Sequence, residues 1–251
     1  MSFVFTMIRR ELLLLKHQWL KKIIFLIIFP MVLYLCLSMT LYNFISIPIL
    51  DYLHWSVPGI LILTSSIVCA NYCLKEISLL KDKEGIYQIF LKSPMSLGNI
   101  IAGIFLISIF YSIVEFIIGA ILLSLLNPGV FSISQGLLIF IQILSFVIFI
   151  SSFSIFLGFL ISNDGIIPYM LMILFLFIAF IFGSLLPVEL FPDQLSNYVQ
   201  MLPMTGIVMN LQAILYMQTP FYFGMFMTIF VGVIFYLFSI VFVYKTLRKV
   251  S

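Results

Sequence analysis

Residues 23–50 read IIFLIIFPMVLYLCLSMTLYNFISIPIL and contain no charged side chain. A helix needs about 20 consecutive apolar residues to cross the hydrocarbon core of a bilayer. This run of 28 residues between Lys22 and Asp51 is therefore long enough for one span and a short loop. A barrel strand would instead alternate apolar and polar residues over about 10 positions. The stretch predicts a membrane helix over 23–42.

The same pattern recurs along the rest of the chain, where charged residues stand in clusters separated by long gaps. There are 23 uncharged residues after Asp51, 48 after Glu115 and 51 after Asp193. The turn sequence at 127–129, Asn-Pro-Gly, divides the gap of 48. We therefore expect a single all-α integral membrane domain over residues 1–251. Its six predicted spans are 23–42, 56–74, 98–125, 135–161, 166–185 and 221–244.

The composition excludes several classes of protein. Hydrophobic residues make up 64% and charged residues 8% of the 251 residues, whereas soluble domains carry about 25% charged residues. A soluble monomer, a disordered chain and a secreted disulfide scaffold are excluded on these grounds. The only histidines are His17 and His54, on opposite predicted faces, so we expect no His-based metal site and no Ser-His relay. No Gly-x-x-x-x-Gly-Lys-(Ser/Thr) loop for ATP occurs, and we expect no cofactor in this chain.

The basic residues predict the orientation. Six spans place both termini on one side, and all 12 Lys and Arg residues then fall on that side. Loops rich in Lys and Arg stay cytoplasmic. We therefore expect a multi-pass protein of the cell membrane with both termini in the cytoplasm. The net charge of +3 reflects this topology rather than a nucleic-acid partner.

The segment before the first span, residues 1–22, is predicted to be a cytoplasmic interfacial helix. Apolar residues recur at steps of three and four from Phe5 to Trp19, while Arg9, Arg10 and Lys16 lie off this stripe. Such a helix lies flat in the headgroup layer, with Trp19 at interface depth and its cations near anionic lipids. The alternative is a plain positively charged start to the first span.

Residues 75–97 form the longest predicted cytoplasmic loop. Gly85 permits a sharp reversal, and residues 86–92 can form a short helix that Pro94 ends. That helix would present Ile86, Ile89 and Phe90 on one side, and an exposed apolar knob on a charged loop suggests a docking surface. The alternative is an ordinary loop packed on its own membrane helices.

At this loop the chain resembles the membrane permeases of type-2 ABC exporters. Their loop between spans 2 and 3 has a basic-acidic-Gly-x-x-Glu-x-x-x-x-(Ser/Thr)-Pro pattern. The sequence matches this pattern at Lys83, Glu84, Gly85, Ser93 and Pro94, and departs from it at Gln88, where the family usually has Glu. The resemblance implies that this loop carries the coupling helix that sits in a cleft of a separate ATPase subunit.

Two further stretches extend the resemblance over nearly the whole chain. Val57-Pro58-Gly59-Ile60 matches the family's Pro-Gly start of span 2, and Gly183, Pro187, Pro192, Pro203 and Thr205 match its pattern before the last span. The resemblance implies a pair of short re-entrant helices in the outer segment, residues 186–220. The prolines agree with this, because they prevent a single helix there.

Glu115 is the only acidic or basic residue well inside a predicted span. An intramembrane carboxylate is costly, so it is expected to face the bundle interior, a cavity or a partner. On one interpretation, Glu115 contacts a substrate cation or acts in a proton-linked gate. On the other it is a protonated or hydrogen-bonded packing residue, paired with Ser112.

The leading hypothesis is the membrane subunit of an ATP-driven ABC exporter. Two such chains, identical or homologous, would form the pathway and dock separate ATPase subunits that bind Mg-ATP, so this chain is not itself an enzyme. The alternative is a stand-alone secondary transporter or channel that uses Glu115. A third hypothesis is a structural or assembly membrane protein. The substrate does not follow from the sequence.

Overall fold

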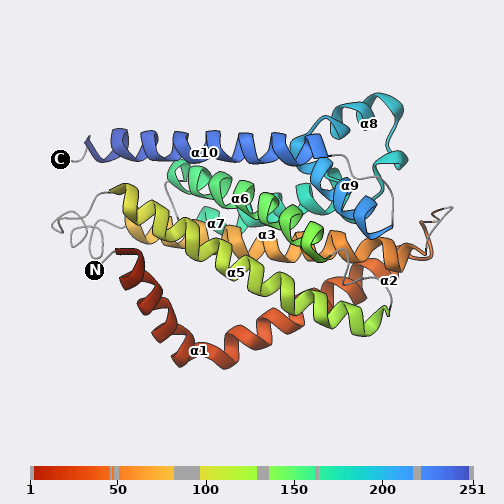
Figure 1. Ribbon diagram of the computed structural model, residues 1–251, viewed down its shortest axis with the longest axis horizontal. Helices are drawn as coiled ribbons and strands as arrows, with labels where there is room; N and C mark the ends of the chain where they lie inside the picture. The colour runs from red at the N-terminus through yellow and green to blue at the C-terminus, as the bar shows by residue number, and fades with distance from the viewer. Residues whose placement is uncertain are drawn as a thin grey trace.

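The computed structural model describes residues 3–45, 47, 51–81, 97–128, 136–161, 164–216 and 222–248, and within these ranges every regular element is a helix. The main helices lie side by side in an elongated bundle (Figure 1). They are α1 (Phe3–Leu33), α3 (Tyr52–Lys81), α5 (Leu97–Leu126), α6 (Gly136–Leu160), α7 (Ile167–Leu176) and α10 (Tyr222–Arg248).

Four helices among the described residues are long and apolar enough to cross a membrane. They are Trp19–Leu41, Tyr52–Leu80, Gly98–Leu126 and Leu138–Leu160, and each overlaps one of the first four predicted spans. The last two predicted spans fall on shorter apolar helices, Ile167–Ile181 and Phe226–Phe242. The described fold is thus all-helical and suited to a multi-pass membrane protein, while the count of six stays a prediction.

The bundle has two distinct ends. The start of α1 and the end of α10 lie at one of them, together with the end of α3 and the start of α5 (Figure 1). We call this the termini-bearing end. Residues 82–96, which connect α3 to α5, lie outside the described residues, and with them every residue of the predicted coupling segment from Lys83 to Pro94.

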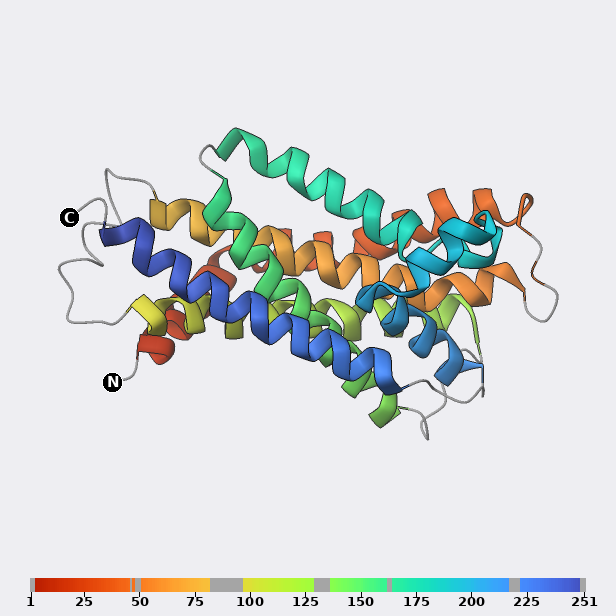
Figure 2. The ribbon, with the colours of Figure 1, turned by 90° about the horizontal axis from the view of Figure 1, so that it is seen from above.

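Helix α3 is the centre of the bundle, with neighbours on both sides in Figure 2. In its apolar 18-residue stretch 78% of the residues are buried, against 22% in the corresponding stretch of α1. The buried hydroxyls of Thr64, Ser65 and Ser66 donate to carbonyls one turn earlier in α3. These bonds satisfy the hydroxyl groups without a partner helix, so polar side chains are tolerated in the apolar core.

Helix α1 is neither straight nor regular. It bends sharply part-way along its length (Figure 1). Near its end it holds Pro30, which has no N–H to donate to the carbonyl four residues earlier. A π-helical turn, Tyr34–Ser38, follows, and α2 (Met39–Leu41) ends the element. The hydroxyl of Tyr34 donates to Asn127 at 2.9 Å, which fixes this turn to the end of α5.

At the opposite end, the segment after α7 folds into short helices. A π-helical turn, Phe177–Ile181, extends α7, and Gly183 then takes a φ of 80°, which L-residues rarely adopt. A 3₁₀ turn (Val188–Leu190), α8 (Asp193–Gln200) and α9 (Pro203–Leu215) follow, with α8 and α9 at 90° to each other. Their depth in a membrane stays a prediction.

Candidate functional site

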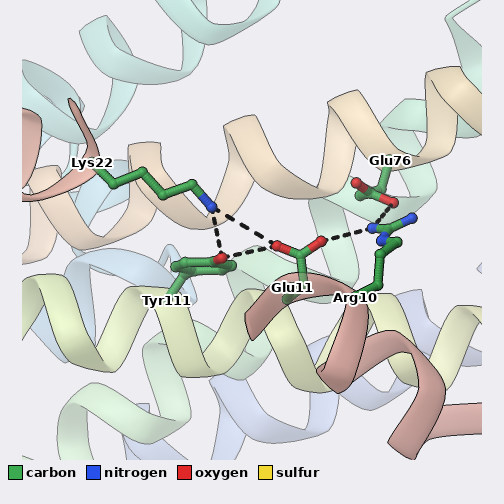
Figure 3. A network of polar contacts seen from close by, with 5 residues as sticks. All are labelled: Arg10, Glu11, Lys22, Glu76 and Tyr111. Atoms are coloured by element: carbon green, nitrogen blue, oxygen red, sulfur yellow. Dashed lines mark hydrogen bonds and ion pairs between the residues drawn. The ribbon is translucent and has the colours of Figure 1, made fainter. Parts of the chain in front are cut away.

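Five polar side chains connect α1 to α3 and α5, as Figure 3 shows. We call them the polar network. Its members are Arg10, Glu11 and Lys22 of α1, Glu76 of α3 and Tyr111 of α5.

The bend in α1 brings its three members together. Glu11 and Lys22 are separated by 11 residues, which is about three turns, so they point to the same side. In a straight helix their Cα atoms would be roughly 16 Å apart. The ammonium of Lys22 nevertheless lies 3.9 Å from Oε2 of Glu11. The bend therefore closes α1 around this carboxylate.

Glu11 is the central acceptor of the network. Its Oε1 accepts a hydrogen bond from Nη2 of Arg10 at 2.8 Å, and its Oε2 accepts one from the hydroxyl of Tyr111 at 2.8 Å. The same Nη2 donates to Oε2 of Glu76 at 2.7 Å, which adds α3 to the network. Lys22 donates to the Tyr111 oxygen at 2.8 Å and lies 4.7 Å from the centre of its ring. Both oxygens of Glu11 are thus used.

The network holds two cations and two carboxylates, so its formal charge is zero. The side chain of Glu11 is 7% exposed and that of Glu76 13%, while that of Arg10 is 36% exposed. Burial lowers the pKa of Arg10, but hydrogen bonds to Glu76 and Glu11 and their charges outweigh this effect and raise its pKa overall. A buried carboxylate is stable only with such compensation. The network therefore fixes the first half of α1 to α3 and α5.

Tyr111→Phe is expected to lower the free energy of unfolding by about 1–3 kcal/mol, because it leaves Glu11 and Lys22 each without one hydrogen bond. Tyr72 is a matched control: its ring lies 5.2 Å from that of Tyr111, but its buried hydroxyl has no partner among the described residues. Tyr72→Phe should be neutral within about 0.5 kcal/mol, or stabilising. Unfolding of both variants in mixed micelles checks this, and equal effects would contradict it.

Glu115 lies deeper in the bundle, one turn beyond Tyr111 on α5. It is fully buried, and neither carboxylate oxygen has a hydrogen-bond partner among the described residues. The predicted pairing with Ser112 is wrong. The hydroxyl of Ser112 donates instead to the backbone carbonyl of Ser65 at 2.9 Å, because α3 packs directly against this face of α5.

The residues predicted for the interfacial helix have different surroundings. Arg9, Lys16 and Trp19 are exposed, while Arg10 binds two carboxylates of the protein rather than facing outward alone. Apart from Trp19, the side chains of the predicted apolar stripe lie outside the described residues. Its placement in the headgroup layer stays a prediction.

The predicted outer residues occupy the boundaries of the short helices. Pro187 precedes the 3₁₀ turn, Pro192 precedes α8, and Pro203 is the first residue of α9. Thr205 is buried inside α9, and its hydroxyl has no partner in the described part of the chain. The carbonyl of Gly183 accepts a hydrogen bond from the side chain of Gln212 at 3.3 Å, which connects the start of this segment to α9.

Four members of the polar network were not predicted from the sequence: Glu11, Lys22, Glu76 and Tyr111. One signal was present. Glu11 and Glu76 are acidic residues among the basic ones that mark the predicted cytoplasmic face, so an ion pair between the two segments was a reasonable expectation.

Among the described residues no cluster of His, Cys, Asp or Glu suited to a metal ion is present.

Comparison with protein-family models gives no match, and comparison with curated proteins gives none either.

Proposed function

We propose that this chain is the membrane-spanning subunit of an ATP-driven exporter of the ABC type. It would work as a dimer of permease chains in the cell membrane, with both termini in the cytoplasm, and would dock separate ATPase subunits through residues 75–97. The resemblance at Lys83-Glu84-Gly85 and Ser93-Pro94 motivates this proposal.

One structural observation supports it most. The polar network connects α1 to α3 and α5, and these are the two helices that flank the proposed docking loop, since α3 ends at Lys81 and α5 begins at Leu97. A force applied to the loop would act on both helices, and the network would transmit it to α1 through Arg10 and Tyr111. Chains of hydrogen bonds and ion pairs of this kind can carry such coupling.

The second candidate is a stand-alone secondary transporter or channel. One observation favours it: Glu115 is fully buried and unpaired within the described residues, and intramembrane carboxylates mark ion pathways in transporters.

Phe90→Asp tests the docking proposal. When the tagged wild-type chain is isolated from its native membranes, an ATPase subunit is expected to co-purify with it. The substitution should remove the co-purifying ATPase activity. Burying an aspartate in place of an aromatic anchor costs about 2 kcal/mol or more, which is about a 30-fold loss of affinity. Phe44→Asp is the matched control, since Phe44 is 85% exposed at the opposite end. It should keep the ATPase.

Two results would count against the exporter. The first is that no ATPase accompanies the wild-type chain. The second is that the purified chain alone, in liposomes without ATP, drives solute flux, which would favour the secondary transporter.

A further inference from the structure

The Glu115 carboxyl lies where three helices meet. Ser112, three residues before it, contacts α3 through the carbonyl of Ser65. Gly119, four residues after it, faces both α3 and α1: a Cβ atom there would meet Leu61 at 2.7 Å and Pro30 at 3.8 Å. Residues three and four apart share a face of a helix. Glu115 therefore points into the junction of α1, α3 and α5.

In the described part of the chain, no donor in this junction is bonded to the Glu115 carboxyl. The hydroxyl of Ser112 donates to Ser65, and the hydroxyls of Thr64 and Ser65 donate to carbonyls of their own helix. Both Glu115 oxygens lack a hydrogen-bond partner among the described residues. A buried charge without partners is strongly unfavourable, and such a group takes up a proton instead.

The register of α1 and α5 places an acceptor opposite Glu115. These helices run in the same direction (Figure 1), and they touch at Lys22 with Tyr111 and at Pro30 with Gly119. The two contacts are separated by eight residues on each helix. Leu26 and Glu115 both lie half-way between them, so these two residues are at the same level. Pro30 has no N–H for the Leu26 carbonyl, and that carbonyl is on the same side of α1 as the Pro30 ring, which faces α5. The Leu26 carbonyl could accept a hydrogen bond from a protonated carboxyl at this level, whereas its negative end would repel a carboxylate.

The ionisable groups around this position are few. On α1 the nearest is Lys22, one turn toward the termini-bearing end, where it donates to Tyr111 of α5. On α3 the first ionisable residues after Ser65 are Cys69 and Tyr72, and neither can supply a positive charge. Helix α6 has no ionisable residue over Gly136–Leu160. Lys22 is already shared between Tyr111 and Glu11. No cation is left to neutralise Glu115 within the described bundle.

We propose that Glu115 is a proton-binding site inside the bundle, with the Leu26 carbonyl of α1 as the acceptor for the bound proton. A proton site at Glu115 would serve the second candidate function, which rests on the same buried carboxyl, but the test below measures proton binding rather than transport, so the two can fail separately.

Dicyclohexylcarbodiimide tests this proposal, because it reacts with protonated carboxyls in apolar surroundings. The carboxyl O–H adds across one C=N bond of the reagent: a C–O bond forms, the proton goes to nitrogen and nothing leaves. The purified chain in vesicles would be labelled from about pH 5 to about pH 10, a range in which an exposed Glu is mostly ionised. Mass spectrometry would then locate the adduct by peptide.

We expect one adduct, on the peptide that holds Glu115, and none at this position in Glu115→Gln. Above the titration midpoint, the rate should fall about ten-fold for each pH unit. Glu11→Gln should keep the adduct. Pro30→Ala restores the N–H donor to the Leu26 carbonyl and should move the midpoint to lower pH.

Three results would overturn the proposal. They are an unlabelled wild-type peptide at the lowest pH, a labelling rate independent of pH, and an adduct on this peptide that persists in Glu115→Gln. An unchanged midpoint in Pro30→Ala would overturn the assignment of Leu26 as acceptor. Peptide mapping of the wild type gives an answer even if a variant does not fold.

Discussion

Gly59→Ala is expected to abolish the folded chain. A Cβ atom at position 59 of α3 would lie 1.7 Å from the backbone oxygen of Ser184 and 2.5 Å from its carbonyl carbon. Backbone atoms cannot move aside as a side chain can, so α3 and the segment after α7 would have to separate. The free energy lost should exceed about 4 kcal/mol, a magnitude that few single substitutions reach.

The surroundings of this contact explain why it cannot relax. The hydroxyl of Tyr52 donates to the carbonyl of Leu185 at 2.6 Å, so the first turn of α3 is held to the residue that follows Ser184. Gln212 of α9 holds the residue that precedes Ser184, through the carbonyl of Gly183 at 3.3 Å. Separation at Gly59 would therefore break the bond from Tyr52 to Leu185, unless the segment moved with α3 and broke its own bond to Gln212 of α9.

Two other glycines provide a graded control series. At Gly98 a Cβ atom meets nothing within 4 Å, and alanine there should be neutral or stabilise α5 by about 0.5–1 kcal/mol. At Gly119 the nearest atom is the end of the Leu61 side chain at 2.7 Å, which can shift, so the effect should be intermediate. The yield of monodisperse protein in detergent and its thermal midpoint measure all three variants. A Gly59→Ala chain as stable as Gly98→Ala would contradict the close contact.

The helices themselves could be predicted from the sequence because a long uncharged run permits few structures. The predicted spans 98–125 and 135–161 differ by one residue at each end from α5 and α6. The predicted span 56–74 is shorter than α3, which begins at Tyr52 and ends at Lys81. Counting charges locates the apolar part of a helix, but a helix can continue past Lys75 and Glu76 into a polar region.

The contacts between helices could not be predicted in the same way. Arg10 and Glu76 are 66 positions apart, and Glu11 and Tyr111 are 100 apart. Such pairs depend on the bend of α1 and on the register of three helices, and hydropathy carries no information on either. The π-helical turns at Tyr34–Ser38 and Phe177–Ile181 were missed for a related reason, since one extra residue in a turn leaves the apolar pattern almost unchanged.

Glu11→Met is expected to lower the free energy of unfolding by about 3 kcal/mol. The substitution removes a carboxylate that is 7% exposed and that accepts from Arg10 and Tyr111. Arg10 keeps Glu76 as a partner, whereas Lys22 loses the only carboxylate within 4 Å in the described chain. Breaking one side of a buried ion pair costs about 3–5 kcal/mol, and the lower value applies because the side chain of Lys22 is 31% exposed.

The double variant Glu11→Met/Lys22→Met separates this explanation from a loss of packing. Replacing both charges of a buried pair by apolar groups is often neutral, so the second substitution should restore more than half of the lost stability. Lys16→Met makes the same chemical change at an exposed position of α1 and should be neutral within about 0.5 kcal/mol. Unfolding in mixed micelles measures all four chains. If the double variant is as unstable as Glu11→Met, the unpaired ammonium of Lys22 is not the cause, and the loss would instead lie with the hydrogen bonds of Arg10 and Tyr111.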